Sequence, residues 1–166
     1  MNWLLEQLPD KVLVDGTEYL VDSDFRAILL IDQIMHDKEL SDTQRVISAL
    51  TIFYGDNPPK QTTQAIEKLV WFFRCGKEQS EQEERRGRFR RHTRAIDYCV
   101  DSHLIWSAFL QVYQIDLTEP IQMHWWKFCS LMENLPDICK LSKVMMYRTV
   151  NTSGMSKQQK SFYAKM

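Results

Sequence analysis

Apolar side chains recur at the spacing of an α-helix in several segments of this chain, and most segments are bounded by a capping or helix-breaking residue. Ser41 and Gln44 match a capping box, and Val46, Leu50 and Phe53 follow at positions i, i+4 and i+7. Five glycines and five prolines among 166 residues favour long helices over many short strands. Helices are expected to begin near Ser23 or Asp24, Ser41, Thr62, Asp101 and Thr118. A further helix is expected to contain Ile138 to Met145, and a short polar helix is expected to begin at Ser156.

A β-hairpin is predicted from Lys11 to Val21. Val12 and Val14 occupy alternate positions before Asp15-Gly16, and Tyr19 and Val21 do so after it; this dipeptide suits the positive φ angles of a tight turn. Alternation of Ile96, Tyr98 and Val100 predicts a third strand near 95–100 that completes a small sheet. We therefore expect a mainly α fold with a small antiparallel β-sheet, as a compact multi-helix single domain over residues 1–166.

Residues 77–94 are almost devoid of apolar side chains. An acidic first part is followed by six arginines: Arg85, Arg86, Arg88, Arg90, Arg91 and Arg94. Such a segment buries too little apolar area to offset its ordering entropy, so we expect a mobile surface insertion. The arginines could bind phosphates, with Phe89 stacked on a base, or contact an acidic protein, but the net charge of −1 favours a solvated loop. Residues 151–166 are expected to form a tail or short helix.

No catalytic, cofactor or metal motif is found in the sequence. Phosphate-binding glycine loops and nucleophile elbows are absent, and the four histidines lack metal-ligand spacing. Cys99 and His103 have i, i+4 spacing, but the first falls in the expected strand and the second in a helix. We therefore expect no enzyme and no cofactor. The absence of a signal peptide or long apolar run predicts a soluble, intracellular protein with reduced cysteines.

The aromatic run Trp125-Trp126-Lys127-Phe128 is the strongest candidate for a partner contact. Trp125 and Phe128 share one helical face and are expected in the core, whereas Trp126 either packs on a neighbouring helix or forms an exposed anchor. Eight methionines are present, and methionine suits adaptable contacts as well as core filling. The candidate partner-binding residues are Trp126, Lys127, Met145, Met146 and Arg148.

Several stretches, in order along nearly the whole chain, resemble the bacteriophage gp-fifteen family of long-tailed phages and prophages of Gram-positive hosts. The arginine-rich insertion departs from the family pattern. The matching stretches are Leu8-Pro9, Asp15-Gly16, Asp22 to Arg26, Trp71 to Lys77, Asp101, Ala108-Phe109, Tyr113 to Leu117, His124 to Phe128, Leu141 to Arg148, and Met155.

The resemblance implies a function in tail assembly. Genes of this family typically lie between those for the tail tube and the tape measure protein, where tail assembly chaperones are encoded. It implies a homo-oligomeric chaperone in the host cytoplasm that keeps the tape measure protein soluble until tail tube subunits displace it. The alternatives are a structural tail or connector component of the virion, and a nucleic-acid-binding regulator acting through Arg85 to Arg94.

Overall fold

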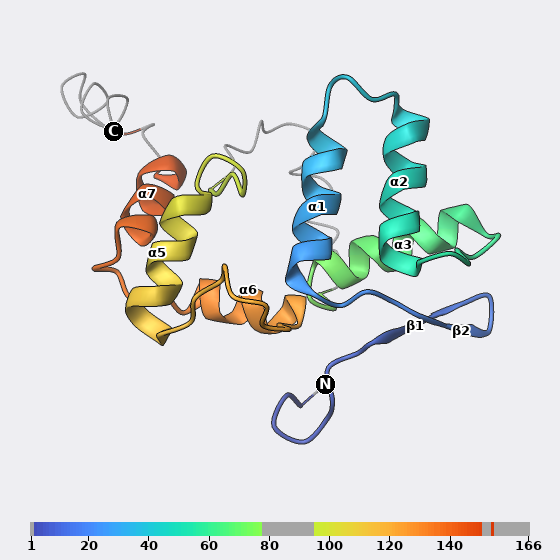
Figure 1. Cartoon of the computed structure of the whole chain (residues 1–166), viewed down its shortest axis with the longest axis horizontal. Helices are drawn as coiled ribbons and strands as arrows, with labels where there is room; N and C mark the ends of the chain where they lie inside the picture. Colours follow the sequence, from blue (N-terminus) through green and yellow to red (C-terminus); the bar gives the residue numbers. More distant parts are fainter. Residues whose placement is uncertain (1, 78–94, 151–153, 155–166) are drawn as a thin grey trace. The chain divides into compact units, whose positions relative to one another are not determined.

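A computed structural model describes residues 2–77, 95–150 and 154 of the chain (Figure 1). This part contains six α-helices and a two-stranded antiparallel sheet, which confirms the mainly α fold with a small sheet. The chain divides into two compact units: unit 1 is Met1–Gln79 with Gln122–Glu133, and unit 2 is Ser80–Ile121 with Asn134–Met166. The expectation of a single domain stays a prediction. Apart from Lys77 and Gly154, the predicted insertion and tail lie outside the described residues.

The hairpin of unit 1 consists of β1 (Lys11–Val14) and β2 (Thr17–Leu20), paired with Val14 opposite Thr17. Asp15 and Gly16 have φ angles of 49° and 74°, as the turn predicted from this dipeptide requires. Val12 and Val14 are buried, and the Asp15 N–H donates to Gln64 Oε1 at 3.0 Å. The hairpin therefore packs on unit 1, as an isolated two-stranded sheet must to be stable.

Three helices follow the hairpin: α1 (Phe25–His36), α2 (Asp42–Tyr54) and α3 (Thr62–Phe73). Figure 1 shows α1 and α2 side by side in opposite directions, with α3 crossing below them. The Asp24 carboxylate caps α1 by accepting from the Arg26 N–H, and α2 ends at Gly55 (φ 68°). The Tyr54 hydroxyl donates to the Ala65 carbonyl, and burial raises the pKa of Tyr54 to about 12.

The predicted capping box at the start of α2 is confirmed. Ser41 Oγ accepts from the Gln44 N–H at 3.3 Å, and Gln44 Oε1 accepts from the Ser41 N–H at 2.9 Å. We expect Ser41→Ala to lower the free energy of unfolding by about 1 kcal/mol, because the Gln44 N–H in the first turn loses its acceptor, Ser41 Oγ. Urea denaturation followed by circular dichroism measures this loss. Thr43→Ala on the exposed first turn is the control, and an equal loss in both variants would contradict the capping role.

Helix α6 (Trp125–Glu133) belongs to unit 1 although it comes late in the chain. The Phe25 N–H donates to the Met123 carbonyl at 2.9 Å, and the Trp125 N–H donates to the Ser23 carbonyl at 2.7 Å. These bonds set α6 against the start of α1, where the rings of Phe25 and Phe128 stack with centroids 4.9 Å apart. Phe25, Phe53, Phe72 and Phe128 are all buried, so the core of unit 1 is largely aromatic.

Unit 2 contains α5 (Ser102–Tyr113) and α7 (Lys140–Thr149), which lie side by side (Figure 1). Leu104, Ile105, Ala108 and Phe109 of α5 are buried, as is Leu141 of α7. Asn134-Leu135-Pro136 separates α6 from α7. Ile138, which was predicted to lie on a helical face, precedes α7 and is exposed.

The strand predicted near 95–100 is wrong, because this stretch forms a turn. The Asp97 carboxylate accepts from the N–H groups of Cys99 and Val100, both at 3.0 Å. The Asp101 N–H then donates to the Asp97 carbonyl at 2.8 Å. Local carboxylate bonds of this kind compete with strand pairing, so the apolar alternation here does not produce a strand.

The helix predicted to start at Thr118-Glu119-Pro120 is also wrong at its first residues. Asp116 Oδ1 accepts from the Thr118 N–H at 2.9 Å and from the Trp106 indole N–H at 2.9 Å, which makes a turn. His124 forms a β-bridge with Asp24, and the Met123 carbonyl accepts from the Phe25 N–H, so the chain is extended at these two residues. The helix therefore begins only at Trp125.

No helix within the described ranges is both long and apolar enough to span a membrane.

Candidate functional site

An apolar hollow, here called the three-helix pocket, lies among α1, α2 and α3. Its volume is about 210 Å³, and nine of its ten lining residues are apolar, the exception being Asp32. Met35 and Val70, which line it, are 42% and 45% exposed. The apolar faces of α1, α2 and α3 therefore extend beyond the side chains that are buried in the core. The lining residues are Ile31, Asp32, Met35, Val46, Ala49, Leu50, Ile66, Leu69, Val70 and Phe73.

A second hollow in unit 1, the tryptophan pocket, has a volume of about 760 Å³ and a more polar lining. It lies between the N-terminal segment, the end of α3 and α6. Lys77 Nζ and Glu133 Oε1 form an ion pair in its wall at 3.1 Å. Its lining residues are Trp3, Glu6, Gln7, Pro9, Trp71, Cys75, Gly76, Lys77, Trp126, Cys129, Ser130 and Glu133.

Trp126, predicted as either a core residue or an exposed anchor, is 2% exposed. Its indole N–H donates to the Phe72 carbonyl at 2.8 Å, and its ring lies near Trp3 and Trp71, with centroids 6.1 and 5.4 Å away. A Cβ at Gly76, whose φ is 74°, would lie 2.8 Å from Trp126 Cη2, so glycine permits this close packing. Trp126 is thus a core residue, and the exposed residue beside it is Lys127.

His124 holds the N-terminal segment against α6. Its Nδ1 accepts from the Trp126 N–H at 3.0 Å, which leaves Nε2 to donate to the Pro9 carbonyl at 3.0 Å. The neutral imidazole satisfies both bonds. Burial lowers the pKa of His124, although the Pro9 carbonyl acts in the opposite direction. The side chain therefore acts as a structural link.

Two cysteines face each other in the wall of the tryptophan pocket. Cys75, at φ 55°, follows α3 and is half-buried, and its side chain is hydrogen bonded to that of Cys129 on α6. This bond and the Lys77 ammonium lower the pKa of Cys75, against the effect of burial. The same bond and burial raise the pKa of Cys129. The sequence gives no signal for this pairing, since 53 residues separate the two cysteines.

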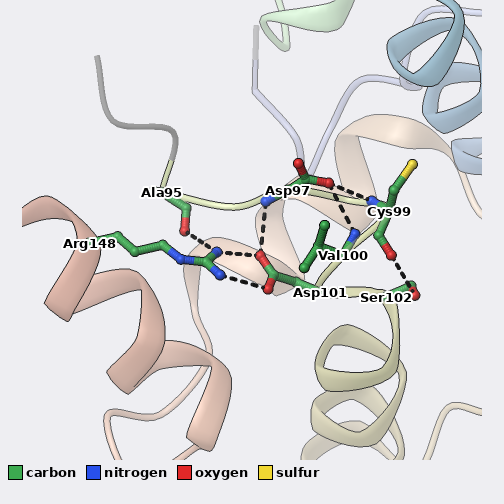
Figure 2. Close-up of polar contacts among 7 residues, drawn as sticks. All are labelled: Ala95, Asp97, Cys99, Val100, Asp101, Ser102 and Arg148. Atoms are coloured by element: carbon green, nitrogen blue, oxygen red, sulfur yellow. Dashed lines mark hydrogen bonds and ion pairs between the residues drawn. The ribbon is translucent and has the colours of Figure 1, made fainter. Parts of the chain in front are cut away.

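Arg148 belongs to a polar network in unit 2, shown in Figure 2. Its guanidinium donates through Nη1 and Nη2 to both oxygens of Asp101, the second at 3.0 Å, and Nη1 also reaches the Ala95 carbonyl at 3.4 Å. Asp101 precedes α5 as predicted, but its carboxylate forms no cap with that helix. It accepts instead from Arg148 and from the Asp97 N–H at 2.9 Å. Arg148 therefore joins α7 to the 95–101 turn.

The other candidate partner-binding residues are divided between the two units. Met146 is 54% exposed and Met145 is half-buried on α7 of unit 2, whereas Lys127 lies on α6 of unit 1. The arginines from Arg85 to Arg94 lie outside the described residues. Among the residues that are described, no group of three or more histidine, cysteine or acidic side chains is placed to hold a metal ion.

Comparison with known proteins connects this chain to bacteriophages. Residues 4–166 match the family model described as Bacteriophage Gp15 protein. No curated protein and no solved structure matches the chain. Since the family match extends over almost all 166 residues, the chain belongs to the Bacteriophage Gp15 family and is a phage protein of the structural or assembly class.

Proposed function

We propose that this protein is a tail assembly chaperone that binds the tape measure protein of its phage and keeps it soluble, without catalysing a reaction. Membership of a phage structural or assembly family supports this function. The observation that carries it is the three-helix pocket, an apolar hollow with exposed methionine and valine side chains. A protein that must hold and later release a hydrophobic partner needs such a surface.

The size and chemistry of the three-helix pocket favour a protein side chain as occupant. Pockets for small molecules typically measure about 300–1,000 Å³ and contain several polar groups. This pocket measures about 210 Å³ and has one charged lining residue, Asp32. An amphipathic helix inserts large apolar side chains into hollows of this kind. A long helical partner could therefore be bound by a few such contacts.

A charged side chain at the edge of the three-helix pocket is expected to weaken binding of the tape measure protein. Val70→Glu adds a carboxylate to a lining whose one charged residue, Asp32, is also acidic, and burying it under an apolar partner without a counter-charge is costly. We expect the Kd for the tape measure protein to rise more than about ten-fold. The measurement is co-expression with the tape measure protein of the same phage, followed by affinity capture and assay of its soluble fraction.

Ile47→Glu is the matched control. Ile47 is an exposed aliphatic residue on α2 that does not line the pocket, so this variant should bind as the wild type does. Met146→Glu tests the exposed methionine of unit 2 in the same assay. Loss of binding in Met146→Glu alone would place the contact on unit 2 and contradict the three-helix pocket. Failure of the wild-type protein to bind would contradict the chaperone function itself.

A structural tail or connector protein is the alternative within the same family-level class. Mass spectrometry of mature phage particles separates the two, because a chaperone leaves the tail and a structural component remains in stoichiometric amount. Detection of this chain in purified virions at a level comparable with tail proteins would favour the structural alternative.

A further inference from the structure

Two thiols from separate elements of unit 1 meet on a pocket wall that solvent reaches. Cys75 follows α3, Cys129 lies on α6, and their side chains are hydrogen bonded beside the tryptophan pocket. We propose that Cys75 and Cys129 form an oxidisable dithiol site, which reacts with a low-molecular-weight disulfide such as glutathione disulfide to give an intramolecular Cys75–Cys129 disulfide. This inference is independent of the proposed partner.

The backbone around both cysteines is fixed by contacts that do not involve sulfur. Trp125 and Trp126 of α6 donate their indole N–H groups to the carbonyls of Phe73 and Phe72, at 2.9 and 2.8 Å. Lys77 pairs with Glu133 at 3.1 Å, one helical turn beyond Cys129. The end of α3 and α6 are therefore held in register on both sides of the thiol pair.

The two sulfur atoms that would form the bond are already in contact through their hydrogen bond. A disulfide has an S–S length of about 2 Å and a Cβ–Cβ separation of about 3.5–4.5 Å, so the reaction draws two sulfur atoms that are already hydrogen bonded closer together. The surrounding contacts already hold α6 against the end of α3, so the bond would join two elements that are packed together. The geometry thus favours an intramolecular bond over a persistent mixed disulfide.

The two thiols differ in a way that suits sequential reaction. The hydrogen bond from Cys129 and the Lys77 ammonium lower the pKa of Cys75, against the effects of burial and of the Glu133 carboxylate. Burial and the same hydrogen bond raise the pKa of Cys129. Cys75 lies two residues from Lys77 on the wall of the tryptophan pocket, and a nearby ammonium favours the thiolate, so we assign Cys75 as the attacking thiol and Cys129 as the resolving thiol. The tryptophan pocket, at about 760 Å³, gives the small disulfide access to Cys75.

The reaction is thiol–disulfide exchange in two steps. The Cys75 thiolate attacks one sulfur of glutathione disulfide, so one glutathione thiolate leaves and a mixed disulfide forms on Cys75. Cys129 loses its proton to solvent and attacks the Cys75 sulfur, and the second glutathione thiolate leaves. The protein loses two electrons and two protons, and one glutathione disulfide is reduced to two glutathione molecules.

The other two cysteines provide internal controls. Cys99 is exposed and Cys139 is buried, and both belong to unit 2. Exposure alone would favour a glutathione adduct on Cys99. Cys99 does not line the tryptophan pocket, so the Cys75–Cys129 bond should form in the Cys99→Ser variant as it does in the wild type.

The test is incubation of the full reduced protein with glutathione disulfide, acid quenching, alkylation and intact-mass measurement with peptide mapping. We expect the wild type and Cys99→Ser to lose the mass of two hydrogens, with Cys75 and Cys129 linked in one peptide pair. Cys129→Ser should accumulate a glutathione adduct on Cys75, and Cys75→Ser should form neither product at these positions. Circular dichroism checks that each variant is folded.

Three results would overturn the proposal, and each of them can be obtained with the wild-type protein alone. These are a stable glutathione adduct on Cys75 with no loss of two hydrogens, a disulfide that includes Cys99 or Cys139, and full alkylation of all four cysteines after the incubation.

Discussion

Trp126→Ala is expected to lower the free energy of unfolding by about 3–5 kcal/mol, the usual cost of truncating a buried tryptophan. The side chain is 2% exposed, contacts the rings of Trp71 and Phe72, and donates its N–H to the Phe72 carbonyl. Alanine would leave a cavity in unit 1 and remove the donor for a carbonyl at the end of α3. A small protein with about 5–15 kcal/mol of stability loses a large fraction of it in this way.

The measurement is urea denaturation followed by circular dichroism, with Lys127→Ala as the matched control. Lys127 is the next residue on α6 and is exposed, so its truncation should change the free energy by no more than about 0.5 kcal/mol. Similar small losses in both variants would show that the Trp126 indole is not part of the core.

Arg148→Met is expected to lower the free energy of unfolding by about 2 kcal/mol. Breaking a fully buried ion pair costs about 3–5 kcal/mol, whereas exposed pairs contribute about 0–1 kcal/mol. Asp101 is 3% exposed and Arg148 is 33% exposed, so the pair lies between these limits. Methionine preserves the aliphatic packing of α7 but leaves a buried carboxylate without its cation (Figure 2).

The same variant should change how stability depends on pH. Arg148 holds the pKa of Asp101 below its ordinary value, against the effect of burial. A carboxylate whose pKa is lower in the folded protein stabilises it above the unfolded pKa, about 3.9, and loses this contribution as pH falls through the folded pKa. The wild type should therefore lose more stability than Arg148→Met between pH 7 and about pH 3.

Denaturation midpoints of both proteins at the two pH values measure this difference. Asp101→Asn is the reciprocal variant, and the double variant completes the cycle. If the two single losses add without coupling, Arg148 and Asp101 do not interact in solution.

Local signals in the sequence predicted most of the helices and the hairpin. The capping box at Ser41 and Gln44 and the Asp15-Gly16 turn act over a few residues, and both lie where they were expected. These features depend on the backbone conformation of their own neighbourhood, which explains why they can be predicted from residue order alone.

The errors come from residues whose side chains bond to nearby backbone or to distant elements. Asp97 and Asp116 accept backbone N–H groups and form turns where apolar alternation predicted a strand and proline predicted a helix start. Asp101 was expected to cap α5, but the distant Arg148 takes its carboxylate. Periodicity cannot indicate which of several possible donors a carboxylate will meet.

The candidate site was predicted only in part. The apolar stripes of α1, α2 and α3 were visible in the sequence, but the three-helix pocket depends on how these helices pack. The core position of Trp126 was one of two alternatives, and the contact between Cys75 and Cys129 was not foreseen. Both depend on the pairing of residues near 72–77 with α6, which lies about fifty residues further along the chain.

The late position of α6 has a consequence for synthesis of the chain. Residues 122–133 complete unit 1, and the bridge between Asp24 and His124 joins positions one hundred residues apart. As the polypeptide leaves the ribosome, the hairpin and α1 to α3 emerge long before the helix that covers Phe25 and Phe72. Unit 1 therefore cannot close its aromatic core until most of the chain has been translated, and its nascent form exposes apolar rings during that interval.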